Sequence, residues 1–253
     1  MSLPAFGFVT VHRPPLAAGI AHEADWLAAS AALGRASAHL WTAPRGLVVP
    51  RRYAALPGWA AAAAAVADGQ HGELQVRVSG GGLVPQGPGV WNLSLAWPAP
   101  AATPVDTDGV YRGLCNTLAA ALARLGLAAT PQPVDGSFCD GRYNLAVDGA
   151  KLVGTAQAWR RVDGRPMVLA HAVIIVTADP AELTARANAF EAALASATRY
   201  RAGAVTSVAL ACGGAAGGGP DIEARTLAVL AEQFARVVAP RVFNPQETTH
   251  GPA

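Results

Sequence analysis

Three short segments of this sequence place reactive side chains next to glycines or tight turns. The first is RVSGGG, in which Arg77 and Ser79 precede or flank three consecutive glycines, Gly80, Gly81 and Gly82. A glycine has no Cβ, so the backbone here can approach a bound ligand more closely than other residues allow. The alternative is a simple turn or bulge between two strands.

The second segment, GSFCDGRYNL, carries a thiol on a tight polar loop just before a predicted strand. The thiol belongs to Cys139, and nucleophiles are commonly presented on such loops because a rigid scaffold holds them in place. The alternative is a small buried hydrophobic residue, which is the commoner role of a free cysteine. We expect that role for Cys115, which lies within a predicted helix, and for Cys212, which lies beside a Gly/Ala run.

The third segment, DGAKLVGTAQ, contains the only lysine of the chain. Lys151 stands alone among 19 basic residues, and the other 18 are arginine. An ammonium is a compact hydrogen-bond donor whose pKa moves on burial, whereas a guanidinium is a bulky fork that stays charged. A lysine kept where arginine is otherwise used therefore indicates a role that arginine cannot fill. Chance survival of one exposed lysine is the alternative.

These segments need a scaffold, and the apolar periodicity predicts strands in the middle of the chain with helices at both ends. Helical spacing of apolar residues predicts helices at 21–35, 59–66, 109–127, 180–197 and 222–238. Strands are predicted at 74–79, 91–97, 143–147, 151–158 and 168–177, and on both sides of the Pro-Arg-Gly turn in HLWTAPRGLVVPRR. Asp148-Gly149 between two strands is a strong hairpin signal. The pattern indicates an α/β fold of the α+β type, with a mixed, largely antiparallel sheet flanked by helices.

The composition argues against several classes of function. Only 14% of the 253 residues are charged and 52% are hydrophobic, which rules out disorder caused by excess charge. A net charge of +2 without a basic stripe argues against a nucleic-acid partner. No apolar run is long enough to span a membrane, and the first residues lack a secretory signal. Three cysteines without a Cys-x-x-Cys pair indicate neither a disulfide framework nor a metal site, and they suit a reducing cytoplasm.

Taken together, the segments resemble the lipoate–protein ligase and octanoyltransferase superfamily, which has the biotin/lipoate protein ligase catalytic fold. The resemblance runs from about His39 to Val238. HLWTAPRGLVVPRR is similar to the family's opening hairpin, RVSGGG to its acyl-binding loop, and VTSV from Val205 to its Val/Ile-Thr-Ser-Val segment. DGAKLVGTAQ is similar to the motif whose lysine holds the acyl carbonyl, a role that falls on Lys151. The resemblance implies that substrate is bound by Arg77, Ser79, Gly80, Gly81, Gly82, Asn92, Gly154, Gln157 and His171.

Two segments favour the amidotransferase branch of this family, in which a cysteine carries the acyl group. GSFC ahead of the lysine motif and GVWNLSL from Gly89 are similar to that branch, so the implied catalytic pair is Cys139 and Lys151. The ligases usually continue their glycine loop with a His-Asp pair, where this chain has Leu83 and Val84. This chain also departs from the family pattern at Ala150 in place of a second lysine, at Trp159 in place of an arginine, and in the Ala-Val that follows His171.

The resemblance implies an acyltransferase that moves an octanoyl or lipoyl group to a lysine of lipoyl-carrier domains through a thioester on Cys139. The implied partners are the glycine-cleavage H protein and the acyltransferase subunits of 2-oxoacid dehydrogenases, and no cofactor is required. We expect one catalytic domain over residues 1–253, with its core at about 20–240 and no C-terminal accessory domain, acting as a monomer. Two alternatives remain: a lipoate ligase that needs ATP and Mg²⁺, with Cys139 a bystander, and a non-catalytic paralogue that binds acyl groups or lipoyl domains.

Overall fold

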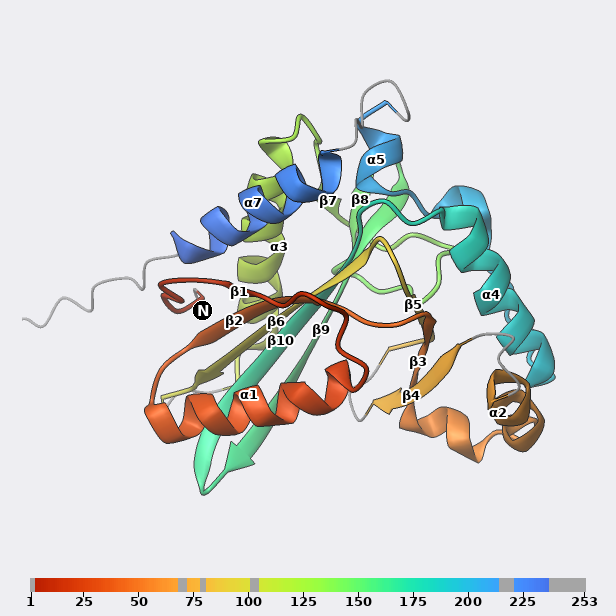
Figure 1. Cartoon of the computed structure of the whole chain (residues 1–253), viewed down its shortest axis with the longest axis horizontal. Coiled ribbons are helices and arrows are strands. Elements are labelled where there is room, and N and C mark those ends of the chain that lie inside the picture. Colours follow the sequence, from red (N-terminus) through yellow and green to blue (C-terminus); the bar gives the residue numbers. More distant parts are fainter. Residues whose placement is uncertain (1–2, 68–71, 78–80, 101–104, 214–220, 237–253) are drawn as a thin grey trace, which may run out of the picture.

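The main layer of the fold is a seven-stranded sheet (Figure 1). The computed structural model of the chain describes residues 3–67, 72–77, 81–100, 105–213 and 221–236. The strand order is β1-β2-β6-β10-β9-β8-β7, and every neighbouring pair is antiparallel except β1 and β2. In chain order the strands are β1 (Thr10–Val11), β2 (Ser37–Thr42), β6 (Val90–Pro98), β7 (Thr130–Pro131), β8 (Leu145–Val147), β9 (Ala150–Val162) and β10 (Arg165–Ile175). The predicted mixed, largely antiparallel sheet is confirmed.

The hairpin predicted for HLWTAPRGLVVPRR is wrong, because its two strands lie in different sheets, the second of which has three strands. The order of this second sheet is β4-β3-β5, with β3 parallel to β4 and antiparallel to β5, and its strands are β3 (Gly46–Pro50), β4 (Glu73–Arg77) and β5 (Val84–Gln86). Strands were expected on both sides of the Pro-Arg-Gly turn, and both exist, but β2 pairs with β6 in the main sheet while β3 lies in the small one. All five residues of β3 are buried, and its two edges pair with β4 and β5, so no edge of β3 remains free to pair with β2.

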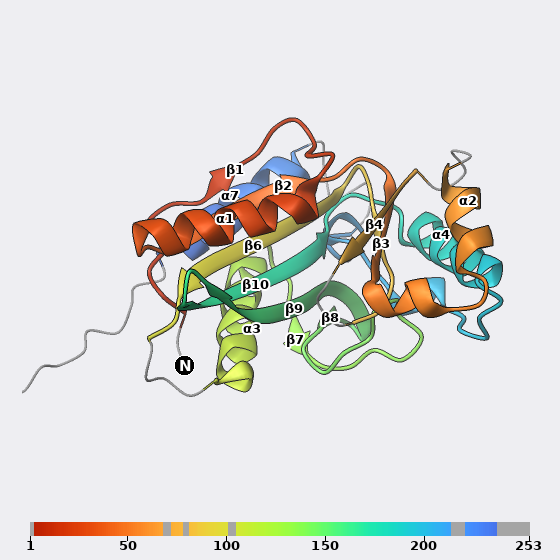
Figure 2. The ribbon, with the colours of Figure 1, turned by 90° about the horizontal axis from the view of Figure 1, so that it is seen from below.

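Helices cover both faces of the main sheet. Figure 2 shows α1 on one face and α3 and α7 on the other, with α2 and α4 beside the small sheet. The helices are α1 (Gly19–Leu33), α2 (Trp59–Ala67), α3 (Thr107–Ala123), α4 (Pro180–Ala193), α5 (Val208–Ala211) and α7 (Ile222–Ala235), with short 3₁₀ turns η1 (Arg51–Ala55) and η2 (Ala202–Ala204). Among the residues that the structure describes, no helix is both long and apolar enough to cross a membrane.

The five predicted helices are confirmed, and four of them end two to four residues earlier than expected. Asp106 caps the start of α3 by accepting a hydrogen bond from the Gly109 N–H at 2.8 Å. The predicted extension to residue 127 fails because the chain turns at Gly126, where φ is 82°. Likewise α4 stops at Ala193 rather than at residue 197, since Ala195 adopts a left-handed φ of 55°. The predicted last two residues of the final helix, 237 and 238, lie outside the described residues.

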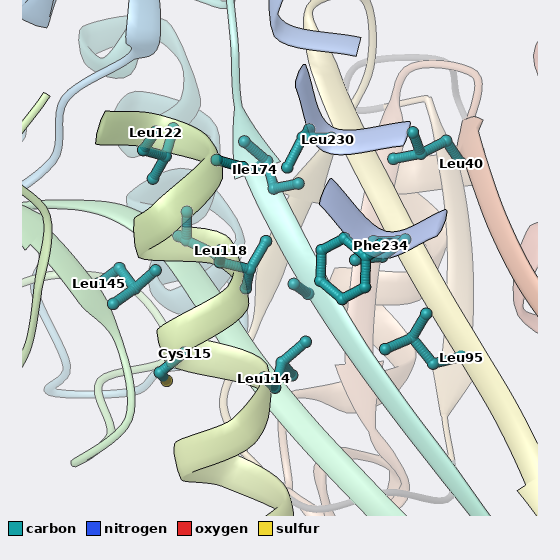
Figure 3. Close-up of a cluster of buried hydrophobic side chains, with 14 of the residues drawn as sticks. Leu40, Leu95, Leu114, Cys115, Leu118, Leu122, Leu145, Ile174, Leu230 and Phe234 are labelled. Carbon is teal, nitrogen blue, oxygen red and sulfur yellow. The ribbon is translucent and has the colours of Figure 1, made fainter. Parts of the chain in front are cut away.

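The main hydrophobic core fills the face of the sheet that α3 and α7 cover (Figure 3). Leucines spaced along α3 and residues of α7 contact the sheet there, and the fully buried members include Leu114, Leu118, Leu122, Leu230, Phe234, Leu40, Leu95 and Ile174. Side chains of a strand alternate between the two faces. On β10, therefore, Ala172 and Ile174 enter this core, while His171, Val173 and Ile175 point to the opposite face.

The hairpin of β8 and β9 forms as predicted. Val147 pairs with Ala150 across a two-residue turn in which Asp148 and Gly149 have φ values of 49° and 77°. Two successive positive φ angles define the tight turn that an Asp-Gly pair favours, because its twist matches that of the strands. The turn places Lys151 second in β9.

Candidate active site

A pocket with an empty volume of about 360 Å³ lies on the face of the main sheet that carries α1. It brings together residues that are far apart in the sequence but were predicted as one site: Arg77, Cys139, Lys151, Gly154 and His171. The rest of its lining is mostly apolar and includes Val84 of β5, Phe138, and Val173 and Ile175 of β10. The pocket therefore places charged and polar side chains beside apolar walls that come from both sheets.

Lys151 lies at the centre of this group and is buried, with only 2% of its surface exposed. Its Nζ donates hydrogen bonds to the carbonyl oxygens of Phe138 and Cys139, each at 2.7 Å. Burial lowers the pKa of Lys151 to about 8, although the charges of Cys139 and Asp140 act in the opposite direction. Because that pKa is above 7, the side chain is mostly an ammonium at neutral pH. An ammonium has three hydrogens, so one remains for a group in the pocket.

Cys139 lies in the loop between β7 and β8 and is partly exposed. Its sulfur accepts a hydrogen bond from the Gly82 N–H at 3.1 Å and lies 3.6 Å from Nη2 of Arg77. Burial acts to raise the pKa of Cys139, but the positive charges of Lys151 and Arg77, together with the Gly82 N–H, bring it below the usual value. The site therefore favours the thiolate, which is the nucleophilic form of a cysteine.

The glycine segment is shaped around this sulfur. Gly81 has a φ of 103°, and a Cβ added there would lie 2.5 Å from Nη2 of Arg77 and 2.9 Å from Sγ of Cys139. Only glycine suits both that backbone angle and that space. Arg77 also donates to the carbonyl oxygen of Gly82 at 2.8 Å, which ties β4 to the segment. Two predicted binding residues, Ser79 and Gly80, lie outside the described residues.

The loop that carries Cys139 is held by its neighbours. Oδ1 of Asp140 accepts hydrogen bonds from the Val134 N–H at 2.7 Å and from Nδ2 of Asn144 at 3.1 Å. Cys139 itself has a left-handed φ of 50°, a conformation that persists only where the surroundings enforce it. On the other side of the site, the Thr206 N–H donates to the carbonyl oxygen of Lys151 at 2.8 Å. The VTSV segment thus supports the backbone of the lysine.

A second, more polar pocket of about 680 Å³ of empty volume adjoins the first. Cys139 lines both pockets, and the second is also lined by Gly81, Tyr111, Arg142, Tyr143 and Gln157. The rings of Tyr111 and Tyr143 stack with their centroids 4.5 Å apart. The thiol therefore stands between an inner, mostly apolar pocket and an outer, more polar one.

The remaining predicted binding residues fall into different places. Gln157 lines the outer pocket, and its amide donates to the carbonyl oxygen of Thr107 at 2.7 Å. Asn92 is buried away from the lining of both pockets. Its amide exchanges two hydrogen bonds with Gln86, at 2.9 and 3.2 Å, which joins β5 to β6. The structure thus gives Asn92 a partner within the protein instead of placing it at the site.

The other two cysteines line neither of these pockets. Cys115 is fully buried, and burial raises its pKa to about 11. Its thiol lies 3.5 Å from the carbonyl oxygen of Tyr143. Cys212, partly buried at the end of α5, lies 3.8 Å from the carbonyl oxygen of Leu125. Both arrangements agree with the expected packing role.

Sequence reasoning missed Glu23, a buried acid of α1. Its Oε1 lies 3.3 Å from Nδ1 of His171 and accepts a hydrogen bond from Oγ of Ser94 at 2.8 Å. A signal was present: the buried residues of α1 recur at helical spacing, and this stripe comprises Gly19, Glu23, Leu27, Ser30 and Ala31. An acid within such a stripe needs a partner from the sheet. Within the described ranges, no group of three or more His, Cys, Asp or Glu residues could hold a metal ion.

Comparison with known proteins identifies the family. Residues 26–213 match the lipoyl protein ligase A/B catalytic domain. A protein of Cupriavidus necator named as uncharacterized is 50% identical over 190 residues, which are 70% of this chain and 75% of that protein. An octanoyl-GcvH:protein N-octanoyltransferase of Kyrpidia tusciae is 40% identical over 147 residues, 56% of this chain and 50% of that protein.

A solved structure agrees with the fold. The crystal structure of lipoate-protein ligase A bound with ATP is similar with a TM-score of 0.60 at 16% identity, covering 91% of this chain and 85% of that one. The fold class predicted from the sequence and the resemblance to this superfamily are thereby confirmed. With most of its length inside the matched region, the chain belongs to the lipoyl protein ligase A/B catalytic domain family.

Proposed function

We propose that this protein transfers an octanoyl or lipoyl group to a lysine of lipoyl-carrier proteins through a thioester on Cys139. The observation that carries the proposal is the sulfur itself, which stands between the two pockets with its thiolate favoured by Lys151 and Arg77. The name of the Kyrpidia relative, which includes the glycine-cleavage carrier, supports the same branch. The proposal needs no ATP, because each bond is made by acyl exchange.

In the first half-reaction, the Cys139 thiolate attacks the carbonyl carbon of the carried acyl group. The C–S bond forms, the bond from the acyl carbon to the carrier's lysine nitrogen breaks, and the amine leaves with a proton. The negative charge that develops on the carbonyl oxygen is met by the remaining hydrogen of the Lys151 ammonium. In the second half-reaction, the amine of the acceptor lysine attacks the thioester, the C–S bond breaks, and the thiolate returns beside Arg77 and Lys151.

The apolar walls of the inner pocket suit the acyl chain. Val84, Val173 and Ile175 line it, and each buried CH₂ contributes about 0.8 kcal/mol. The outer pocket would receive the lysine side chain of the carrier or acceptor domain, because it is the more polar of the two and shares Cys139, Thr155 and Ala156 with the inner one. The reacting nitrogen would then lie where the two pockets meet. The protein partners proposed are lipoyl-carrier domains, including the glycine-cleavage H protein.

Intact-mass spectrometry tests this function. The protein is incubated without ATP with a lipoyl-carrier domain bearing an octanoyl group, and we expect a mass increase of one octanoyl group on the enzyme. Addition of an unmodified acceptor domain should remove that increase and acylate the acceptor. No adduct, together with acylation that depends strictly on ATP and free lipoate or octanoate, would instead establish a ligase.

The rate of adduct formation is expected to show a bell-shaped dependence on pH. Burial lowers the pKa of Lys151 to about 8, so the donor ammonium is present below that pH and is lost as the pH rises through it. The thiolate of Cys139 has the opposite dependence, since it is lost as the pH falls through its lowered pKa. Adduct formation from a thioester donor should therefore decline above about pH 8. Alkylation by iodoacetamide, which needs only the thiolate, should not decline, and parallel profiles for the two reactions would contradict the role given to Lys151.

Replacing Gly154 with alanine is expected to slow adduct formation by about 10-fold. Displacing a catalytic group by 1 Å costs about 10²-fold, and the displacement here is a few tenths of an ångström. A Cβ at this position would lie 3.2 Å from both Cε and Nζ of Lys151, so the ammonium must shift. Gly203→Ala is the matched control, since nothing lies within 4 Å of a Cβ there. Stopped-time mass spectrometry gives both rates, and equal rates for the two variants would show that the position of Nζ is not critical.

A further inference from the structure

His171 and Glu23 form a buried carboxylate–histidine pair at the wall of the inner pocket. His171, on β10, lines the pocket, and its Nδ1 lies 3.3 Å from Oε1 of Glu23 on α1. The side chains of His171 and Glu23 are only 13% and 10% exposed. Ser94 donates to the same carboxylate oxygen at 2.8 Å, and Nε1 of Trp41 donates to Oγ of Ser94 at 3.0 Å. The position of the carboxylate is thus set from the sheet as well as from its own helix.

The charge of Glu23 bears on which nitrogen of His171 carries the hydrogen. Burial acts to raise the pKa of Glu23, but the charge that His171 carries when it is protonated, the Ser94 hydroxyl and the charge of Arg77 bring it below the ordinary value. Glu23 is therefore a carboxylate, which only accepts hydrogen bonds. The charge of the carboxylate favours a hydrogen on Nδ1, the ring nitrogen 3.3 Å from it, although this nitrogen makes no hydrogen bond of good geometry, and the lone pair of a neutral ring then lies on Nε2.

Both half-reactions of the proposed transfer move a proton at a lysine nitrogen. The leaving amine must gain one, and the attacking amine must lose one. Arg77 does not exchange its proton near neutral pH, and Lys151, an ammonium there, already donates two hydrogens to carbonyl oxygens. Cys139 is occupied as the acyl carrier. Besides Lys151, whose remaining hydrogen is assigned to the carbonyl oxygen of the acyl group, His171 is the described residue of the inner pocket whose side-chain type ordinarily exchanges a proton at this pH.

We propose that His171 is the catalytic residue that accepts the proton of the attacking lysine amine, and that Glu23 is the positioning residue that holds it for this task. The inference rests on the proposed function. As the C–N bond forms, the proton passes from the amine nitrogen to Nε2, the C–S bond breaks, and its electron pair returns to the sulfur of Cys139. The imidazolium then lies beside the carboxylate of Glu23, and the same steps run in reverse when a carrier lysine leaves.

The inference is tested on enzyme that already carries the octanoyl group, loaded from an octanoyl thioester. A thiolate leaving group needs no proton, so loading of His171→Ala should proceed. Transfer from that variant to the lysine of a lipoyl domain should fall by about 10²–10⁴-fold, the usual contribution of a general base. Release by hydroxylamine, which is a neutral nucleophile at pH 7, should stay at the wild-type rate. Added imidazole should restore part of the transfer to lysine.

Glu23→Gln separates positioning from packing. The glutamine oxygen can still face Nδ1 and accept from Ser94, but the charge is lost, so transfer to lysine should fall while loading and the melting temperature are kept. The pH dependence of transfer by Glu23→Gln should also change on the acid side. In the unchanged protein the charges facing the imidazole are those of Glu23, Arg77, Lys151 and Cys139. The matched control is Glu191→Gln, which removes another buried carboxylate, one that accepts from the hydroxyls of Tyr53 and Tyr200 at 2.7 and 2.9 Å outside the lining of both pockets.

Three results would overturn the inference. Wild-type transfer rates in His171→Ala would remove the base. A loss of transfer that imidazole does not restore, accompanied by a lower melting temperature in Glu23→Gln, would reduce the pair to a structural tie between α1 and the sheet. Equal losses of transfer in Glu23→Gln and Glu191→Gln would likewise show that the pair has only a structural role. Failure of the wild-type enzyme to load at all would instead remove the proposed function, and this inference would fall with it.

Discussion

Cys139→Ser is expected to lose both the octanoyl adduct and acyl transfer, with a fall of at least about 10³-fold. Lys151 and Arg77 favour a thiolate at this position, but a serine hydroxyl has a pKa far too high for the same charges to ionise it. The substitution changes one atom of similar size, so the pockets and the fold should be kept. Intact-mass spectrometry after incubation with an octanoylated carrier, followed by an acceptor acylation assay, measures both losses.

Cys115→Ser and Cys212→Ser are the matched controls for this prediction. Cys115 is buried with a pKa raised to about 11, and neither residue lines a pocket that contains the site. Both variants should keep the adduct and the transfer. A Cys139→Ser protein that remains fully active and requires ATP would sink the thioester route and establish the ligase alternative, in which Lys151 alone would hold the acyl group.

Lys151→Arg is expected to slow acyl transfer by about 10²–10³-fold, the usual cost of losing one donor to a developing oxyanion. The ammonium lies between two carbonyl oxygens at 2.7 Å, with Gly154 facing it so closely that even a Cβ would lie 3.2 Å away. A planar guanidinium is larger than this space and cannot present a single hydrogen at the same point. The rate of adduct formation and the melting temperature should be measured together.

Arg112→Lys is the control for a lysine–arginine exchange elsewhere on the chain. Its side chain is 68% exposed on α3, where either cation can pair with Asp108, so both the rate and the melting temperature should stay unchanged. If Lys151→Arg kept more than about a tenth of the wild-type rate, the loss would be smaller than that of one oxyanion donor. The compact ammonium would then not be essential to the site.

Much of the site could be predicted because its signals are local. The lone lysine, the Asp148-Gly149 turn and the cysteine a dozen residues before that lysine all lie in one stretch. A two-residue turn determines the strand pairing on either side of it, so the approach of Lys151 to the Cys139 loop follows from the hairpin. Helical periodicity similarly located α1 and α3, since apolar spacing of 3.6 residues depends only on near neighbours.

Other features were decided by partners that the local sequence does not specify. The role of Asn92 depended on Gln86, whose amide pairs with it at 2.9 Å. The separation of β2 from β3 depended on which distant strands each one meets. Hydrogen bonds of a strand are satisfied by whichever backbone lies beside it, so a pattern of buried residues shows that a strand exists without showing its partner.

The sequence by itself determined the fold class, the family and the pairing of a thiol with a single ammonium, because these depend on periodicity, tight turns and residue types close together along the chain. Only the tertiary structure decided that Glu23 meets His171, 148 positions apart, and that Cys139 opens on two pockets. A helix carries its apolar stripe wherever it packs, so the residue that an acid within that stripe will face is chosen when the helix docks on the sheet.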